Sequence, residues 1–146
     1  MIKNLLIIDD DPHSVELTEH VVRDYQFAEK IKVLANGREG LSYFNLLATE
    51  PNVPAPELVI LDLYMPIMNG WEFLDAFSIR YRDRFPQTCF CLLSASKSPE
   101  DKLKSLSYSC VIYLINKPIA ARHLGFLEKF LQSRSQLFLN TGEKWE

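Results

Sequence analysis

The sequence predicts an α/β fold: a doubly wound, five-stranded parallel sheet in the (βα)5 pattern, with each strand followed by a helix. Two observations lead to this prediction. Five short runs rich in Ile, Val and Leu occur along the 146 residues, and most of them do not alternate with polar residues. Such runs are typical of strands buried on both faces, as in parallel sheets. Between the runs lie segments with apolar residues at helical spacing.

The five expected strands are spread along the chain: Leu5–Ile8, Ile31–Ala35, Leu58–Leu61, Cys89–Leu93 and Val111–Ile115. Because parallel strands are joined by right-handed crossovers, helices are expected to cover both faces of the sheet. The expected strand order is 2-1-3-4-5, the flavodoxin-like arrangement, which places the first and third strands side by side.

Four of the five expected helices begin at a pair of residues that favours a helix start: Asp11-Pro12, Asn36-Gly37, Asn69-Gly70 and Ser98-Pro99. Asp, Asn and Ser accept hydrogen bonds from the first free amides of a helix, and Pro suits its first turn. Asp101, three residues after Ser98, predicts a capping box at the fourth helix. Apolar residues at helical spacing support the other four: Val15, Val22 and Tyr25; Leu41, Phe44 and Leu47; Phe73, Leu74 and Phe77; Leu124, Leu127 and Leu131.

The composition excludes several classes of function. Sixteen basic and 19 acidic residues give a formal net charge of −3, which argues against general binding to nucleic acids or anionic membranes. The longest apolar run, Cys110–Ile115, is much shorter than the roughly 18 residues of a membrane helix. The apolar run Leu5–Ile8 is also too short for a secretory signal. Three cysteines without metal-binding spacing predict reduced thiols and a cytoplasmic location.

One domain is expected from a chain of this length. Residues 1–132 are expected to form that domain, and residues 133–146 to form a C-terminal tail without an output domain. The tail is polar apart from Leu137–Leu139 and Trp145.

Reactive side chains follow four of the expected strands: Asp9, Asp10 and Asp11 after the first, Asp62 after the third, Ser94 after the fourth and Lys117 after the fifth. Ligands of a doubly wound sheet bind at this carboxyl edge, near the switch in strand order. Because the first and third strands are neighbours, Asp9, Asp10 and Asp62 are expected to converge. Asp11 is better explained as a helix cap. Each residue alone is commonly a turn or surface residue, but their shared position predicts one site.

Three carboxylates in one crevice repel one another unless a cation joins them. Oxygen ligands of this kind suit Mg²⁺ or Mn²⁺. A carboxylate nucleophile, a divalent cation, an ammonium group and a hydroxyl together fit phosphoryl transfer. The chain has no glycine-rich phosphate loop, and its histidines, His13, His20 and His123, have no metal or triad spacing.

Several motifs carry a family resemblance: Leu5–Pro12, Ala35–Gly37, Leu58–Gly70, Leu93–Ala95 and Asn116–Pro118. Together they resemble the signatures of the response-regulator receiver domain of two-component signalling, of the stand-alone type found in chemotaxis. The most specific stretch is Asp62-x-x-Met65-Pro66-x-x-Asn69-Gly70. The resemblance runs from about Lys3 to Gln132, nearly the whole chain.

The resemblance implies a role for each matching residue. Asp62 resembles the phosphoacceptor, while Asp9 and Asp10 resemble the acidic pair that binds Mg²⁺, Asp10 more directly. The backbone carbonyl of Tyr64 would complete the protein ligands, and the bulk of its side chain is expected to slow the attack of water on the acyl phosphate. Ser94 stands at the family's switch Thr or Ser.

Lys117 resembles the lysine that contacts the phosphoryl group, and the resemblance suggests a cis bond between Lys117 and Pro118. The family usually has an aromatic residue or histidine as part of the switch, three residues before this lysine. That position here is Leu114, with Tyr113 one residue earlier. Alternation along a strand places Tyr113 on the face of Lys117, and Ile112 and Leu114 on the opposite face.

Three functions remain open from the sequence. The first is a phosphorylation-dependent switch that receives its phosphoryl group from a sensor histidine kinase or a histidine phosphotransfer protein and then binds a downstream target protein. The second is a phosphorelay intermediate that passes the group on to a histidine phosphotransfer protein. In both, the chain catalyses only its own phosphorylation and dephosphorylation, with no direct contact to nucleic acid or membrane expected.

The third function, an Mg²⁺-dependent phosphohydrolase, is the weakest. Haloacid-dehalogenase-type enzymes have an Asp-x-Asp-x-Thr pattern after the first strand, and neither Asp9 nor Asp10 begins such a pattern. A cap domain, which those enzymes carry, is not expected in a chain of this length.

Overall fold

The computed structural model describes the backbone of residues 1–141 and the side chains as far as residue 135. Its helices and strands alternate along the chain: β1 (Ile2–Ile8), α1 (Pro12–Tyr25), β2 (Ala28–Leu34), α2 (Gly37–Thr49), β3 (Leu58–Asp62), α3 (Gly70–Arg80), β4 (Cys89–Ser94), α4 (Pro99–Ser105), β5 (Val111–Asn116) and α5 (Ala121–Thr141). Every neighbouring pair of strands is parallel, and their order is β2-β1-β3-β4-β5. The predicted fold and strand order are therefore confirmed.

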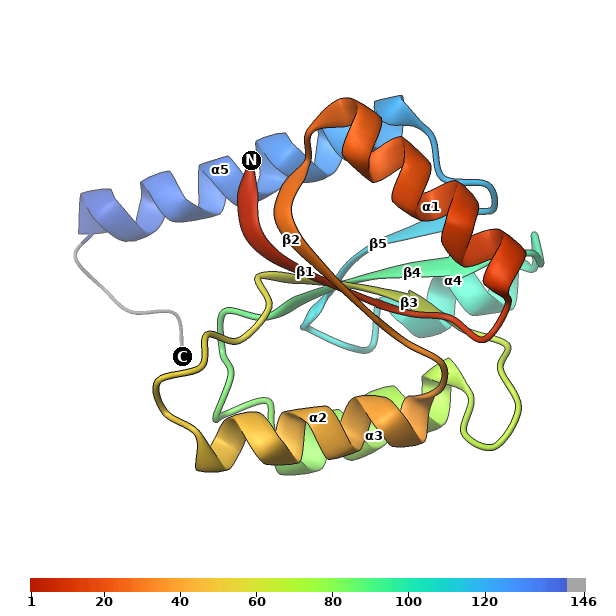
Figure 1. The fold of residues 1–146 in the computed structure, drawn as a ribbon, viewed down its shortest axis with the longest axis horizontal. Coiled ribbons are helices and arrows are strands. Elements are labelled where there is room, and N and C mark those ends of the chain that lie inside the picture. The colour runs from red at the N-terminus through yellow and green to blue at the C-terminus, as the bar shows by residue number, and fades with distance from the viewer. Residues whose placement is uncertain (142–146) are drawn as a thin grey trace.

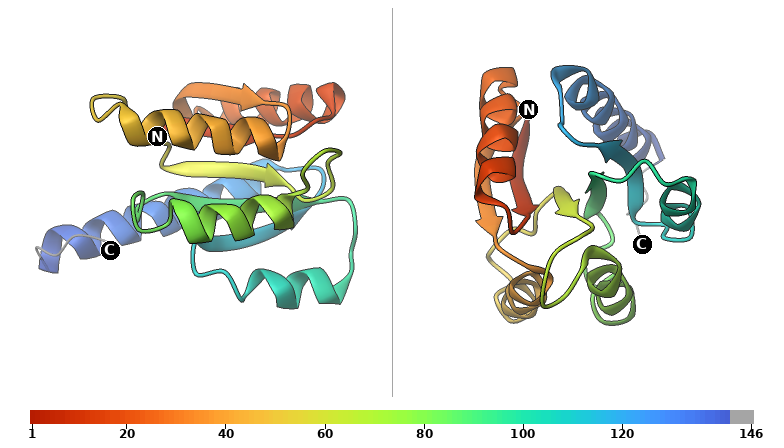
Figure 2. Two further views of the ribbon diagram at one scale, coloured as in Figure 1. Left: turned by 90° about the horizontal axis from the view of Figure 1, so that it is seen from below. Right: turned by 90° about the vertical axis from the view of Figure 1, so that its right-hand side faces the viewer.

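The sheet lies between two layers of helices (Figure 1). Helices α1 and α5 cover one face, and α2 and α3 cover the other; α4 lies beside β5 (Figure 2). The strands β1, β3 and β4 are almost entirely buried, as their continuous apolar runs predicted, whereas the edge strands β2 and β5 are partly exposed. An apolar core fills each side of the sheet.

The two cores have different compositions. The core under α1 and α5 is mainly aliphatic, with Leu124 and Leu127 of α5 fully buried in it. The core under α2 and α3 is largely aromatic, and the ring of Phe77 makes edge contacts with Phe44 and Phe90 at centroid distances of 4.9 and 4.8 Å. Both cores hold the central strands rigidly, which fixes the positions of the residues that follow those strands.

The first three helices are capped as predicted, by Asp11, Asn36 and Asn69, each of which accepts a backbone amide hydrogen bond. The capping box expected at α4 is wrong. The hydroxyl of Ser98 makes no capping bond and donates instead to the carboxylate of Glu100. Asp101 is buried, and its carboxylate accepts a hydrogen bond from the phenol of Tyr64.

Strand β5 departs from the expected alternation at one residue. Consecutive residues of β4 pair with Val111 and then Tyr113, so Ile112 is an extra residue in a β-bulge. Ile112 therefore packs on the same side as Tyr113, against the α1 and α5 core, and the prediction for Ile112 is wrong. Leu114 packs against the opposite core, as predicted.

Helix α5 continues to Thr141, past the boundary expected at residue 132. The side chains of Leu137–Leu139 and all of Trp145 lie outside the described part of the chain. No helix within the described residues combines the length and the apolar character that spanning a membrane requires.

Candidate functional site

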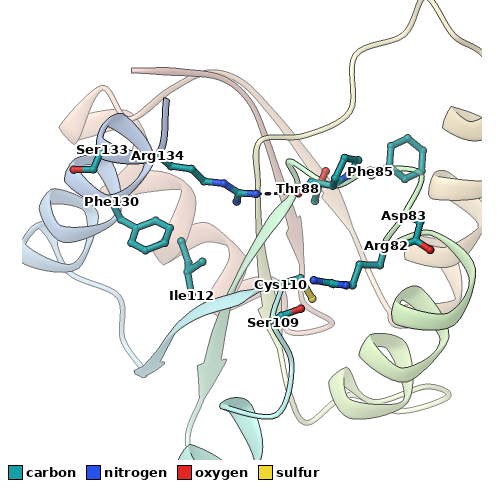
Figure 3. A pocket seen from close by; sticks show the side chains of 11 residues that line it. Arg82, Asp83, Phe85, Thr88, Ser109, Cys110, Ile112, Phe130, Ser133 and Arg134 are labelled. Carbon is teal, nitrogen blue, oxygen red and sulfur yellow. Dashed lines mark hydrogen bonds between the residues drawn. The ribbon is translucent and has the colours of Figure 1, made fainter. Parts of the chain in front are cut away.

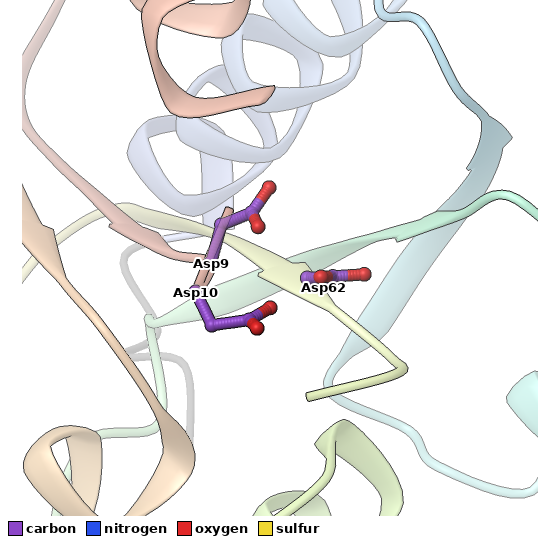
Figure 4. A group of neighbouring side chains, drawn as sticks. All are labelled: Asp9, Asp10 and Asp62. Atoms are coloured by element: carbon purple, nitrogen blue, oxygen red, sulfur yellow. The ribbon is translucent and has the colours of Figure 1, made fainter. Parts of the chain in front are cut away.

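Three carboxylates meet at the carboxyl edge of the sheet, as predicted (Figure 4). Asp9 and Asp10 follow β1, Asp62 ends β3, and one oxygen from each lies within 4.8 Å of the others. The pairing of Ile8 with Leu61 explains this convergence. Asp9 and Asp62 directly follow these two paired residues, so they lie side by side at the same edge of the sheet. Asp9 and Asp62 are 2% and 4% exposed, whereas Asp10 is exposed. The cluster is thus anchored in the protein and open on one side.

Asp9 is fixed by three donors. The hydroxyl of Ser14 donates to its Oδ2 at 2.7 Å, and the backbone amide of Asp11 donates to its Oδ1 at 3.0 Å. The ammonium group of Lys117 lies 3.3 Å from Oδ2. Asp11 has a different role, because its own carboxylate accepts the amide of His13 at 3.0 Å and caps α1. Asp11 therefore caps α1, as predicted, and lies outside the cluster of Asp9, Asp10 and Asp62.

Asp62 lies close to both a positive and a negative charge. Lys117 Nζ is 3.5 Å from its Oδ2, and the amide of Tyr64 donates to its Oδ1 at 3.4 Å. Burial and the charge of Asp9 raise the pKa of Asp62 to about 6, although Lys117 acts in the opposite direction. A carboxylate with such a pKa is mostly ionised at pH 7 yet more basic than an ordinary aspartate, which suits a nucleophile.

The ends of β4 and β5 complete the edge. The backbone amide of Lys117 donates to the carbonyl of Ser94 at 2.9 Å, and the Lys117-Pro118 bond is cis, as the resemblance suggested. Ser94 is fully buried, and its hydroxyl accepts the amide of Ser96 at 3.0 Å and donates to the carbonyl of Ser96 at 3.2 Å. Ser94 therefore stands at the predicted edge with its hydroxyl engaged in the β4–α4 turn.

The loop between β3 and α3 is tightly built. The amide of Gly70 donates to the carbonyl of Leu63 at 2.8 Å, and a Cβ on Gly70 would lie 2.8 Å from the carbonyl oxygen of Asp62. Glycine is thus required where α3 begins against the end of β3. Ile67 has a φ of 71°, and the amide of Met68 donates across it to Pro66 at 2.8 Å. A β-branched residue in that conformation is strained.

Tyr64 has a partner that the sequence did not indicate. Its phenol donates to Oδ2 of Asp101 in α4 at 2.5 Å. The hydrogen bond raises the pKa of Tyr64, and burial adds to the shift. Asp101 is 8% exposed and was expected only as a capping residue. A contact between residues so far apart in the chain has no signature in local spacing.

A separate cavity of about 450 Å³ lies at the opposite edge of the sheet, between the starts of β4 and β5 and helix α5 (Figure 3). Arg82, Cys110 and Phe130 are among its lining residues, and Arg134 donates to the carbonyl of Pro86 at 2.9 Å. None of the site residues predicted from the sequence lines it. The predicted residues instead gather at the carboxyl edge, the region where doubly wound sheets bind ligands.

Comparisons with known proteins agree with this geometry. The family model of the response regulator receiver domain matches residues 5–125. A solved two-component response regulator from Cytophaga hutchinsonii superposes with a TM-score of 0.84 at 29% identity, covering 90% of this chain and 98% of that chain.

Curated relatives include proteins of two lengths. Transcriptional regulatory protein CitT of Halalkalibacterium halodurans is 28% identical over 131 residues, which are 89% of this chain and 53% of CitT. Response regulator Rcp1 of Synechocystis sp. is 23% identical, with 95% of this chain and 90% of Rcp1 covered. The chain therefore spans about half the length of CitT but nearly all of Rcp1.

Proposed function

The chain belongs to the response regulator receiver domain family, and from that membership we propose that it is a phosphorylation-dependent signalling switch with Asp62 as its phosphoacceptor. Members of this family are signalling switches and not classical enzymes. One observation carries the proposal: a buried carboxylate, two further carboxylates and an ammonium group lie together at one edge of the sheet. Phosphoryl transfer to a carboxylate requires this combination of nucleophile, cation ligands and positive charge.

In the proposed reaction, a carboxylate oxygen of Asp62 attacks the phosphorus of a phosphohistidine. The O–P bond forms as the P–N bond breaks, and the imidazole nitrogen leaves with the electron pair of that bond. Lys117, 3.5 Å from Asp62, supplies positive charge for the oxygens of the transferred group. In a separate resetting reaction, a water oxygen attacks the phosphorus and gives up a proton to solvent, the O–P bond to Asp62 breaks, the Asp62 carboxylate leaves and inorganic phosphate is released. The chain catalyses both steps on itself.

We propose Asp9, Asp10, Asp62 and the backbone carbonyl of Tyr64 as ligands of a Mg²⁺ or Mn²⁺ ion. The donors are all oxygens, which small hard cations prefer. The charge of Asp9 helps to raise the pKa of Asp62, and this crowding of negative charge is what a bound cation relieves. When bound, the cation neutralises charge on the phosphoryl oxygens. Ser94 is proposed to donate its hydroxyl to the phosphoryl group after release from Ser96.

The proposed partners are a sensor histidine kinase or a histidine phosphotransfer protein as donor and a downstream target protein as receiver of the signal. Direct contact with nucleic acid or membrane is not part of the proposal. Three buried free cysteines, Cys89, Cys91 and Cys110, support a reducing location such as the cytoplasm.

The experiment that tests this function is phosphotransfer profiling. The chain is mixed with each phosphorylated histidine kinase and phosphotransfer protein of its source genome, with Mg²⁺ or with EDTA. Rapid transfer from one donor in Mg²⁺ and none in EDTA is the expected result. Onward transfer to a phosphotransfer protein would identify a relay, and failure to accept from every donor would contradict the proposal.

A further inference from the structure

Helix α4 is fastened to the rest of the protein in an unusual way. It is seven residues long, and its buried residues are both polar, Asp101 and Ser105. The apolar residues at its carboxyl end, Leu103 and Leu106, are 69% and 80% exposed. An open hollow of about 550 Å³ is lined by residues of both α4 and β5. Burial of apolar side chains therefore contributes little to the position of this helix.

Side-chain bridges hold α4, and the segment between α4 and β5, to the β3–α3 part of the chain instead. There are three: the Tyr64 phenol donates to Asp101 at 2.5 Å, Lys104 Nζ lies 4.7 Å from the centre of the Trp71 ring, and the Tyr108 phenol donates to Asp75 at 2.5 Å. Two of these bridges end on α3. The third ends on the loop that directly follows Asp62.

Tyr64 is thus hydrogen-bonded to two carboxylates in different parts of the structure, one at the end of β3 and one in α4. Its amide donates to Asp62, and its phenol donates to Asp101. We infer that Asp101 is a positioning residue for Tyr64, and that their hydrogen bond is the link through which phosphorylation of Asp62 changes the position of α4. This inference rests on the proposed role of Asp62 as phosphoacceptor.

The chemistry of the bond supports the link. A phosphoryl group on Asp62 changes the charge and bulk of the group beside the Tyr64 amide. The tyrosine side chain has only two rotatable bonds and its hydroxyl is bonded to Asp101, so a shift of its backbone acts on that hydrogen bond. Asp101 is nearly buried, and a hydrogen bond to a buried carboxylate is stronger than one between neutral groups. We therefore expect the Asp101 carboxylate to follow the Tyr64 hydroxyl, and α4, which carries Asp101, to follow in turn.

The residues at the family's usual switch position do not offer this link. Leu114 has no polar group. Tyr113 packs its ring against Phe126 of α5, with the centroids 4.6 Å apart, on the opposite side of β5 from Leu114. Within the described residues, Tyr64 is the side chain that joins the loop after Asp62 to α4 by a hydrogen bond.

Hydrogen exchange of the α4 amides tests the inference. It is measured with and without acetyl phosphate and Mg²⁺ in the wild type, Tyr64→Phe, Asp101→Ala and the double variant. Mass spectrometry of the intact chain records the extent of phosphorylation. Without phosphorylation, each single variant should speed α4 exchange roughly five- to tenfold, because the donor Tyr64 is 52% exposed and water offsets part of the strength of a bond to a carboxylate. The double variant should be no faster than either single variant, because both remove the same bond.

The phosphorylation-dependent change in α4 exchange should be present in the wild type and largely lost in all three variants. Asp101→Asn, which keeps an acceptor oxygen, should partly restore it. Tyr108→Phe is the matched control: it removes the Tyr–Asp bond between the segment after α4 and α3, and should keep the response. Central-strand amides should exchange equally in every variant, which checks that the fold is intact.

The outcomes separate the two proposals. A wild-type chain that gains no phosphoryl group would contradict the proposed function, and the inference with it. A phosphorylated wild type with unchanged α4 exchange would overturn the inference alone. So would a full response in phosphorylated Tyr64→Phe or Asp101→Ala, or an equal loss in Tyr108→Phe.

Discussion

The ammonium nitrogen of Lys117 lies 3.5 Å from an oxygen of Asp62, although β4 separates the strands that carry the two residues. The same nitrogen lies 3.3 Å from Asp9. Lys117 is thus placed between two buried carboxylates, where its charge is only weakly screened by water. Its charge offsets part of the rise that burial causes in the pKa of Asp62, the proposed phosphoacceptor.

The first prediction concerns this lysine. Lys117→Ala should raise the pKa of Asp62 above its value of about 6, because the nearby positive charge that lowers it is lost. A smaller fraction of Asp62 is then ionised at pH 7, so the fall in phosphotransfer at low pH should begin at a higher pH. NMR titration of the Asp62 carboxyl carbon in EDTA measures the shift. Lys117→Arg keeps the charge and serves as the control; an unchanged pKa in Lys117→Ala would contradict the prediction.

The second prediction concerns stability. In EDTA, Asp62→Asn should raise the free energy of unfolding at pH 7 by at most about 3 kcal/mol. The pKa of Asp62 is raised in the folded chain from 3.8 to about 6, so the folded state binds the proton more tightly. Protonation of Asp62 therefore stabilises the folded wild type fully below pH 3.8, and this contribution to the free energy of unfolding is lost as the pH rises through 6.

Urea denaturation at pH 5 and pH 7.5 checks the sign of this effect. The advantage of Asp62→Asn should grow with pH. Asp10→Asn alters an exposed carboxylate and should show a much smaller change. An Asp62→Asn chain that is less stable than wild type at pH 7.5 would show that the folded site favours the ionised form.

The third prediction separates two neighbouring aspartates. Asp10→Ala should weaken Mg²⁺ binding by on the order of tenfold or more, since even residues that only support metal ligands cost that much. Asp11→Ala should leave Mg²⁺ binding nearly unchanged and lower the free energy of unfolding by about 1 kcal/mol, because Asp11 caps α1. Calorimetric titration and urea denaturation measure the two effects. Equal losses of Mg²⁺ affinity would contradict the division.

The fourth prediction concerns the loop after Asp62. Ile67→Gly should raise the free energy of unfolding by about 1 kcal/mol, because glycine adopts a φ of 71° without the clash of a β-branched side chain. Ile79 is also exposed but lies in α3, so Ile79→Gly should have the opposite sign and a similar size. Thermal or urea denaturation compares the two. Destabilisation by both substitutions would show that the Ile67 side chain makes a contact outweighing its strain.

Local and periodic features of the sequence predicted most of this structure. Apolar runs located the strands, and strand order then brought Asp9, Asp10 and Asp62 together, because paired strands end at the same edge. Asp11 and Asn69 capped their helices as expected, since a cap depends on residues only two or three positions away. The cis bond before Pro118 followed from the family resemblance.

Features that depend on tertiary packing were not predicted. The bulge at Ile112 depends on how β5 pairs with β4, and spacing along one strand does not reveal it. Asp101 has the spacing of a capping residue, yet its buried position beside Tyr64 decides its role. The engagement of Ser94 with Ser96 likewise depends on the path of the β4–α4 turn.

The most direct test of the whole account is phosphoryl labelling of Asp62. Wild type, Asp62→Asn and the control Asp24→Asn, an exposed residue of α1, are incubated with acetyl phosphate and Mg²⁺, and the phosphorylated residue is mapped by mass spectrometry. The wild type and Asp24→Asn should gain one phosphoryl group on Asp62, and Asp62→Asn should gain none while keeping its fold. Labelling of Asp62→Asn to the wild-type level, or a wild-type label on another residue, would contradict the assignment of Asp62 as the phosphoacceptor.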